Sequence, residues 1–105
     1  MSAYNKITAI VRKELLEQIL EQLQQSGVCG LSLTEVNGFG ECEDFYRHDW
    51  SVTHARIEIF CRADEAEGVA DTIQQAAATG IAGDGIIAIL PVESLRHIRG
   101  EGTGT

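Results

Sequence analysis

The hydrophobic period of this chain changes from two residues to about 3.6 and back, and it does so twice. Alternating apolar and polar residues are typical of a half-buried strand, whereas a 3.6-residue stripe is typical of an amphipathic helix. The patterns predict strands and helices in the order strand, helix, strand, strand, helix, strand, at residues 6–12, 13–25, 31–36, 52–62, 63–79 and 86–90. After Pro91, which is expected to end the last strand, a weaker extended pattern follows over residues 92–99.

Two similar β-α-β halves predict an α+β fold of the ferredoxin-like type, with a four-stranded antiparallel sheet and two helices on one face. In the strand over 52–62 the residues of one parity are apolar and predicted to face the helices. The other parity places four residues on the opposite, uncovered face, namely His54, Arg56, Glu58 and Phe60. The 105 residues form one domain, 1–105, and a domain this small buries a limited share of its surface. We therefore expect a dimer or trimer that covers the bare face.

The charge balance excludes some classes of partner. The formal net charge is −8, so the chain lacks the basic footprint needed for nonspecific nucleic-acid binding. No apolar run approaches the length of a membrane span.

The three cysteines are odd in number and irregularly spaced, which favours a reduced, cytoplasmic setting over a disulfide framework.

Two glycine-rich turns are the candidate binding elements. The turn over 79–85 contains three glycines, which permit positive φ angles and let several N–H groups converge on an anion such as phosphate. Gly38-Phe39-Gly40 is the second turn, and nearby cations would complete a nucleotide or anion pocket: Arg56, Arg96, His97 and Arg99. The alternatives are an ordinary helix-to-strand turn and solvated surface charges. If the pocket exists, Gly85→Glu is expected to block phosphate binding and leave the fold intact.

Catalysis has little support in the sequence, and we expect no enzyme activity and no metal cofactor. None of the three histidines belongs to a nucleophile or metal motif, although His48 and His54 flank Trp50 at a spacing that leaves weak metal binding open. The acidic stretch over 40–50 is expected to form an exposed loop that is functional or flexible. The tail over 100–105 has no apolar residue to bury and is expected to be flexible.

Three stretches together resemble the PII signal-transduction family. They are Lys6-Ile7-Thr8-Ala9-Ile10-Val11, the run from Gly27 to Gly40 with the pattern G-x-x-G-x-x-x-T-E-V-x-G-F-G, and Thr79-Gly80-Ile81-Ala82-Gly83-Asp84-Gly85. The resemblance covers roughly residues 5–100. It implies a regulatory, ferredoxin-like homotrimer that binds adenine nucleotides between subunits and contacts other proteins through an exposed loop, the T-loop, here residues 40–53.

Position by position, the resemblance also implies site residues. The nucleotide-pocket positions would be Ile10, Ser32, Gly38, Phe39, Gly40, Glu58, Phe60, Gly83, Asp84, Gly85, His97 and Arg99. The effector or anion positions would be Glu41, Cys42 and His54.

Several departures from the family pattern point to a particular subtype. The T-loop is shortened by several residues. Glu41 and Cys42 replace an arginine and the glutamine that helps to bind Mg²⁺ and 2-oxoglutarate, His97 replaces an arginine, and isoleucines replace the two lysines that flank Gly-Asp-Gly. Fewer cations near the terminal phosphates favour ADP or AMP over ATP.

The chain is therefore similar to the carboxysome-associated PII-like proteins, which implies sensing of ADP or AMP with bicarbonate and a partner such as a bicarbonate transporter. Two alternatives stay open. One is a nitrogen-regulatory PII protein that binds ATP and 2-oxoglutarate and controls an ammonium channel or an enzyme. The other is a metal-binding trimer of the copper-tolerance type, which would use His48, His54 and Cys42.

Overall fold

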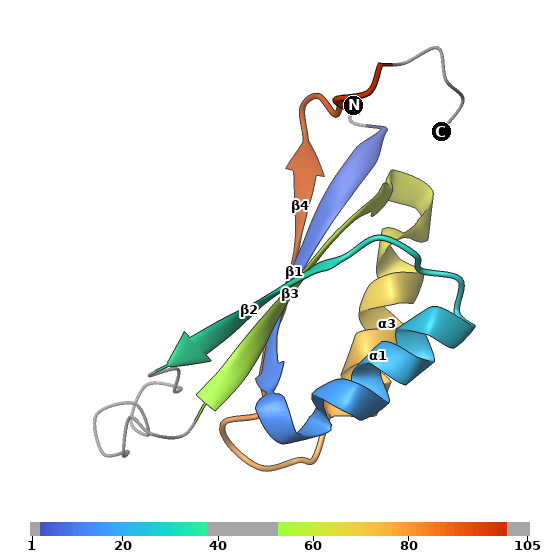
Figure 1. Ribbon diagram of the computed structural model, residues 1–105. Coiled ribbons are helices and arrows are strands. Elements are labelled where there is room, and N and C mark those ends of the chain that lie inside the picture. Colours follow the sequence, from blue (N-terminus) through green and yellow to red (C-terminus); the bar gives the residue numbers. More distant parts are fainter. Residues whose placement is uncertain (1–2, 38–52, 101–105) are drawn as a thin grey trace.

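The computed structural model describes residues 3–37 and 53–100, and its elements follow the predicted order (Figure 1). Short 3₁₀ turns, η1 and η2, lead into the two helices. The elements are β1 (Tyr4–Arg12), η1 (Lys13–Leu15), α1 (Leu16–Gln25), β2 (Ser32–Asn37), β3 (Thr53–Arg62), η2 (Ala63–Glu65), α3 (Ala66–Ala77) and β4 (Gly85–Val92). The predicted T-loop, apart from Thr53, and the predicted tail beyond residue 100 lie outside the described residues.

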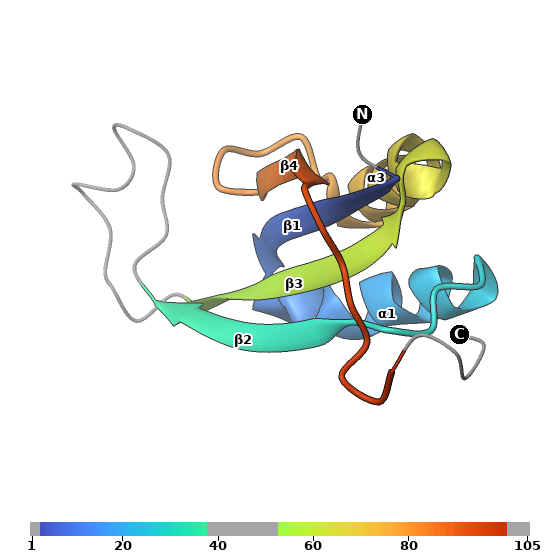
Figure 2. The ribbon, with the colours of Figure 1, turned by 90° about the horizontal axis from the view of Figure 1, so that it is seen from above.

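The four strands form one antiparallel sheet in the order β2-β3-β1-β4 (Figure 2). Both helices cover the same face of this sheet, and α1 packs against α3 (Figure 1). This arrangement confirms the predicted ferredoxin-like fold. No helix in the described parts of the chain is long and apolar enough to cross a membrane.

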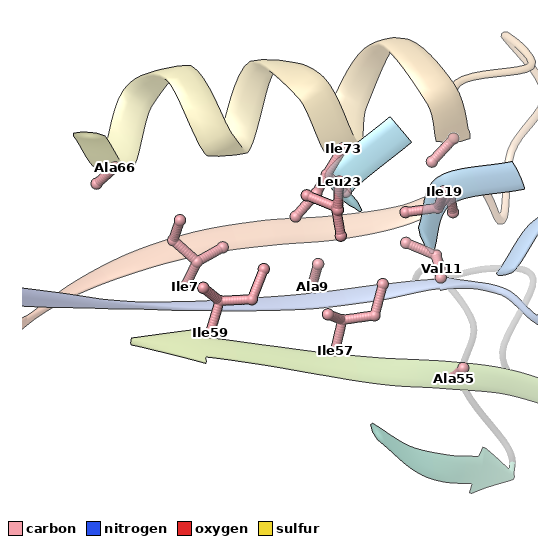
Figure 3. Packing of buried hydrophobic residues seen from close by; sticks show 11 residues of the cluster. Ile7, Ala9, Val11, Ile19, Leu23, Ala55, Ile57, Ile59, Ala66 and Ile73 are labelled. Carbon is pink, nitrogen blue, oxygen red and sulfur yellow. The ribbon is translucent and has the colours of Figure 1, made fainter. Parts of the chain in front are cut away.

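The core lies between the sheet and the helices (Figure 3). It contains the apolar parity of β1 and β3 and one stripe of each helix, as the periodicity predicts. Its fully buried side chains of largest volume are Ile7, Ile19, Leu23, Ile57, Ile59, Ile73 and Val11. Each such side chain contributes about 1.5–3 kcal/mol through burial, which makes this layer the main source of stability.

Several predicted boundaries shift by one to three residues, and the ends of α3 and β4 have a visible cause. Helix α3 ends at Ala77 rather than Thr79, because Ala78 is extended and the Thr79 N–H bonds to the Asp84 side chain instead of a helix carbonyl. Strand β4 continues through Pro91 to Val92. A proline is tolerated there because β4 is an edge strand, where part of the N–H groups face away from the sheet. Residues 93–97 have no regular secondary structure, so the predicted extended segment adds no further strand.

Candidate functional site

The turn between α3 and β4 is folded around the carboxylate of Asp84. Oδ2 accepts hydrogen bonds from the N–H groups of Thr79 (2.7 Å) and Gly80 (2.9 Å). Oδ1 accepts one from the Thr79 hydroxyl (2.5 Å), whose oxygen also accepts the Ile81 N–H (3.2 Å). The first part of the predicted anion-binding turn therefore already binds an internal anion.

Arg12, the last residue of β1, attaches this turn to the sheet. Its Nε donates to Asp84 Oδ1 at 3.0 Å and its Nη2 donates to the Ala82 carbonyl at 2.9 Å. Hydrogen bonds from the Thr79 hydroxyl and N–H, together with those from Arg12 and the Gly80 N–H, hold the pKa of Asp84 well below its usual range. The carboxylate is thus ionised at any pH near neutrality, and the turn has a fixed shape.

Gly85 lies where the turn meets the sheet, and its geometry excludes a side chain. Its φ is +120°, and a Cβ built on it would lie 1.7 Å from the Ile10 carbonyl oxygen. The prediction that Gly85→Glu would leave the fold intact is therefore wrong, because any Cβ pushes β4 away from β1. Gly83 has a milder contact: its φ is +96°, and the nearest atom to a Cβ would be Nη2 of Arg12 at 3.3 Å.

The alternation of β3 predicted His54 on an uncovered face, but the structure buries it. It is only 3% exposed, and its Nε2 is 2.9 Å from the Gly83 carbonyl oxygen. The reason is tertiary: His54 pairs with Arg12 at the end of the sheet that the turn covers. Burial there makes His54 a support of the turn, and it leaves little of the ring accessible to an effector.

A cavity of about 300 Å³ lies beside the turn. Asp84 and Gly85 form one side of it, and the neighbouring ends of β1, β4 and α3 supply Ile10, Val11, Ile86, Ile87, Gln74, Ala77 and Ala78. Its lining combines apolar side chains with polar groups in nearly equal measure. Such a mixed surface suits a ligand that has both an apolar part and a polar part.

The helix-free face of the sheet combines apolar side chains with one ion pair. Lys6 Nζ lies 2.9 Å from Glu58 Oε2 and 5.9 Å from the centre of the Phe60 ring. The hydrogen bond from Lys6 lowers the pKa of Glu58. Phe60, Ile86 and Leu90 are 52%, 51% and 43% exposed. This face therefore still presents a substantial apolar surface.

Arg56 lies on the same face, in a row with Thr34, Ile10 and Ile86 across the sheet. Its Nε is buried and has no hydrogen-bond partner within residues 3–37 and 53–100. A buried N–H of a guanidinium costs free energy unless it meets an acceptor. Arg56 is therefore suited to receive an anion or a group from another subunit.

The predicted site residues fall into separate groups in one protomer. Gly83, Asp84, Gly85 and Ile10 meet at the turn, and Glu58 and Phe60 lie further along the open face. Ser32 is exposed at the start of β2, opposite Glu58. Gly38, Phe39, Gly40, Glu41, Cys42 and His48 lie outside the described residues.

His97 and Arg99 lie at the far end of the molecule from the turn. They follow β4, whereas the turn precedes it, and Figure 1 shows the two segments at opposite ends of the sheet. The eight residues of β4 span about 25 Å. One protomer therefore does not bring these two residues to Gly83-Asp84-Gly85.

Three residues of the site were not predicted from the sequence: Arg12, Lys6 and the bonding role of Thr79. Arg12 and Lys6 stand at the ends of an otherwise apolar strand, which is a weak signal because such positions are commonly solvated. No group of three or more histidine, cysteine, aspartate or glutamate side chains among the described residues is arranged to hold a metal ion.

The chain is similar to known regulatory proteins along nearly its whole length. Residues 4–102 match the family model described as nitrogen regulatory protein P-II. The nitrogen regulatory protein P-II of Cereibacter sphaeroides is 39% identical over 106 residues, covering 94% of this chain and 95% of that protein. The Mesorhizobium japonicum protein of the same name is 35% identical, with coverages of 94% and 95%.

Plant relatives show the same similarity. An Arabidopsis thaliana nitrogen regulatory protein P-II homolog is 34% identical over 93% of this chain, which spans 54% of that protein's length. A crystal structure of Arabidopsis thaliana PII bound to citrate superposes with a TM-score of 0.79 at 36% identity. The superposition covers 95% of this chain and 88% of that one.

Proposed function

Because the chain belongs to the nitrogen regulatory protein P-II family, we propose that it is a cytoplasmic, non-enzymatic homotrimer that senses adenine nucleotides. The family is regulatory, and its members act through other proteins. The subtype proposed here responds to ADP or AMP in preference to ATP.

A trimer would supply two things that one protomer lacks: a cover for its apolar face, and His97 and Arg99 close to the turn. The apolar helix-free face provides a surface for subunit contact, with Ile86 and Leu90 at one edge and Phe60 near its middle. Contact between neighbours would also let His97 and Arg99 of one subunit approach the Gly83-Asp84-Gly85 turn of the next. The separation of these groups within a protomer supports a site at the subunit boundary.

The exposed isoleucines around the turn carry the proposed preference for ADP or AMP. Ile81 is 67% exposed and Ile86 is 51% exposed, so neither is needed for the core. At these positions the family resemblance leads one to expect lysines. Arg12, the cation that reaches this turn, is already bonded to Asp84 and Ala82. The terminal phosphate of ATP would therefore meet less positive charge at this turn than it would if Ile81 and Ile86 were lysines.

A small anion, which we propose to be bicarbonate, would occupy space near the shorter phosphate chain. The Arg56 Nε, which has no hydrogen-bond partner among the described residues, supports this, because it lies in the same cross-strand row as Ile86 and Ile10. The response would be passed through residues 40–53 to a partner protein, such as a bicarbonate transporter, in inorganic carbon uptake or carboxysome function.

Calorimetric titration of ATP, ADP and AMP tests the proposal, with each nucleotide repeated in bicarbonate and in 2-oxoglutarate. We expect ADP or AMP to bind more tightly than ATP, and bicarbonate to strengthen that binding. Arg56→Gln should remove the bicarbonate effect and retain nucleotide binding. Tight ATP binding coupled to 2-oxoglutarate would contradict the proposal.

Two substitutions locate the ligand at the turn. Ile86→Lys should raise the affinity for ATP relative to ADP by about tenfold, the effect of one charge-assisted contact of about 1.4 kcal/mol. Gln24→Lys adds the same charge on exposed α1 and should leave this ratio unchanged. Ala82→Glu, at an exposed turn position, should weaken every nucleotide and retain the fold, replacing the unsuitable Gly85→Glu.

Mixed trimers test whether the site lies between subunits. Ala82→Glu damages the turn, and Arg99→Ala damages the segment at the opposite end of the sheet. Co-refolding the two variants should restore some intact sites, because one boundary can combine the normal turn and the normal Arg99. Mixed trimers that bind no better than either pure variant would show that both groups act within one protomer.

A nitrogen-regulatory role is the second candidate, favoured by the names of the Cereibacter and Mesorhizobium relatives. It requires 2-oxoglutarate binding together with Mg-ATP. The replacement of the expected glutamine by Cys42 argues against that binding. A titration with 2-oxoglutarate in Mg-ATP therefore distinguishes the two roles.

A further inference from the structure

A second cavity, of about 290 Å³, lies near the start of β2 and contains two cysteines. Cys29, from the segment between α1 and β2, and Cys61, near the end of β3, both line it. Phe60, Glu65 and Val69 are among its other walls. Two thiols at one cavity form a different kind of site from the turn around Asp84.

The β2–β3 register, extended beyond the end of its ladder, would set these cysteines opposite each other. Ser32 pairs with Glu58 in the antiparallel β2–β3 ladder, which begins at Ser32. Continuing the same register by three residues brings Cys29 to the position facing Cys61. Residues directly opposite in antiparallel strands have Cβ atoms about 4.5–5.5 Å apart, and a disulfide needs about 3.5–4.5 Å. Residues 29–31 lie outside this ladder, so the movement that closes the bond falls on them, whereas the Val28 N–H is held by the Leu23 carbonyl.

We propose that Cys29 and Cys61 form a reversible redox pair that peroxide converts to an intramolecular disulfide. In the first step the Cys29 sulfur attacks hydrogen peroxide, giving a sulfenic acid and one water. In the second step the Cys61 sulfur displaces the hydroxyl as water and forms the S–S bond. Two thiols are oxidised and one peroxide is reduced to two waters; a dithiol reductant reverses the change.

The environments of the two thiols determine this order. Cys29 is exposed, so peroxide reaches it directly. Cys61 is half-buried, and desolvation followed by the charges of Glu65 and Asp64 raises its pKa. A protonated, half-buried thiol reacts slowly with peroxide and serves better as the resolving partner. A metal site is not favoured, since the described residues contain no suitable cluster of three ligands.

The test uses the full-length protein with Cys42→Ser, so that Cys42 cannot pair with either thiol. Peroxide treatment should remove two hydrogens from the intact mass. Trypsin should then release residues 14–47 linked to residues 57–62, a species that dithiothreitol separates. Cys29→Ser and Cys61→Ser in the same background should each abolish the linked peptide.

Protein unfolded in urea is the control for a disulfide that forms by chance collision of the two thiols. If the fold places the thiols together, the linked peptide should form at least tenfold faster in the native protein. The proposal is overturned if native protein gains only oxygen atoms, if the disulfide joins two chains on a non-reducing gel, or if urea leaves the rate unchanged.

Discussion

Among the described glycines, Gly85 is the one at which an added Cβ would make the shortest contact. The position combines a φ of +120° with a backbone oxygen 1.7 Å from any Cβ. Strain from the φ alone costs about 1–3 kcal/mol, and the clash can be relieved only by separating β4 from β1.

Gly85→Ala should therefore lower the free energy of unfolding by about 3 kcal/mol or more. Gly30→Ala is the matched control, since a Cβ added at Gly30 would have no atom within 4 Å, and it should change stability by less than about 0.5 kcal/mol. Urea unfolding followed by circular dichroism measures both. Equal stabilities of the two variants would show that β1 and β4 can separate at little cost.

Asp84 makes the turn sensitive to acid. The folded-state pKa of its carboxyl is lowered, so its contribution to stability is complete above the unfolded value of about 3.9 and is lost as pH falls further. Asp84→Asn should therefore be less stable than wild type by a constant amount between pH 5 and about 7. That difference should shrink below about pH 4.

Unfolding in urea at a series of pH values gives this profile. Glu14→Gln is the control, because Glu14 is exposed and no interaction with a described residue is seen for its side chain. A gap between wild type and Asp84→Asn that grows toward low pH would contradict the bonding described for the turn.

At the scale of the element, α1 ends through a specific backbone arrangement. Gly27 has a φ of +92°, and its N–H donates to the Gln24 carbonyl at 3.0 Å. The Val28 N–H donates to the Leu23 carbonyl at 3.0 Å, and Val28 packs against the core. These are the two bonds of a Schellman motif, which turns the chain from α1 toward β2.

Gly27→Ala should lower stability by about 1 kcal/mol, because no atom crowds its Cβ and only the positive φ is penalised. Gly68→Ala should have the opposite sign and add up to about 1 kcal/mol, since Gly68 is exposed inside α3. Thermal and urea unfolding compare the pair. A stabilising Gly27→Ala would mean that the end of α1 does not need the left-handed residue.

At the scale of the whole molecule, we expect the helix-free face to form the contact between subunits. Leu90 and Ile86 project from β4 on this face, and Phe60 adds a third exposed apolar side chain. Monomeric proteins rarely leave such a surface exposed to water, which is why a second and third copy are expected on it.

Leu90→Asp should dissociate the proposed trimer, because it would bury a charge at the expected contact between subunits. Gln75→Asp places the same charge on exposed α3 and should leave the trimer intact. Light scattering after size exclusion gives the mass of each. A trimeric Leu90→Asp, or a monomeric wild type, would assign this face another role.

The order of elements and the core were predictable because both depend on local periodicity. Ile7, Ala9 and Val11 share a face of any strand, and Ile19 and Leu23 share a face of any helix, whatever surrounds them. The glycine spacing likewise identified the turn over 79–85 before its shape was visible. At these positions, the local residue pattern is enough to predict the element and which of its side chains share a face.

Only the tertiary structure decided how the site is organised. Arg12 and Asp84 are 72 positions apart, so no local pattern shows that their bond closes the turn. His54 obeys the alternation of β3 yet is buried, because a distant turn covers that end of the strand. Gly85 and Arg99 are separated by the length of β4, which depends on where the chain enters and leaves the sheet. Sequence determined which residues are available, whereas long-range packing determined which of them meet.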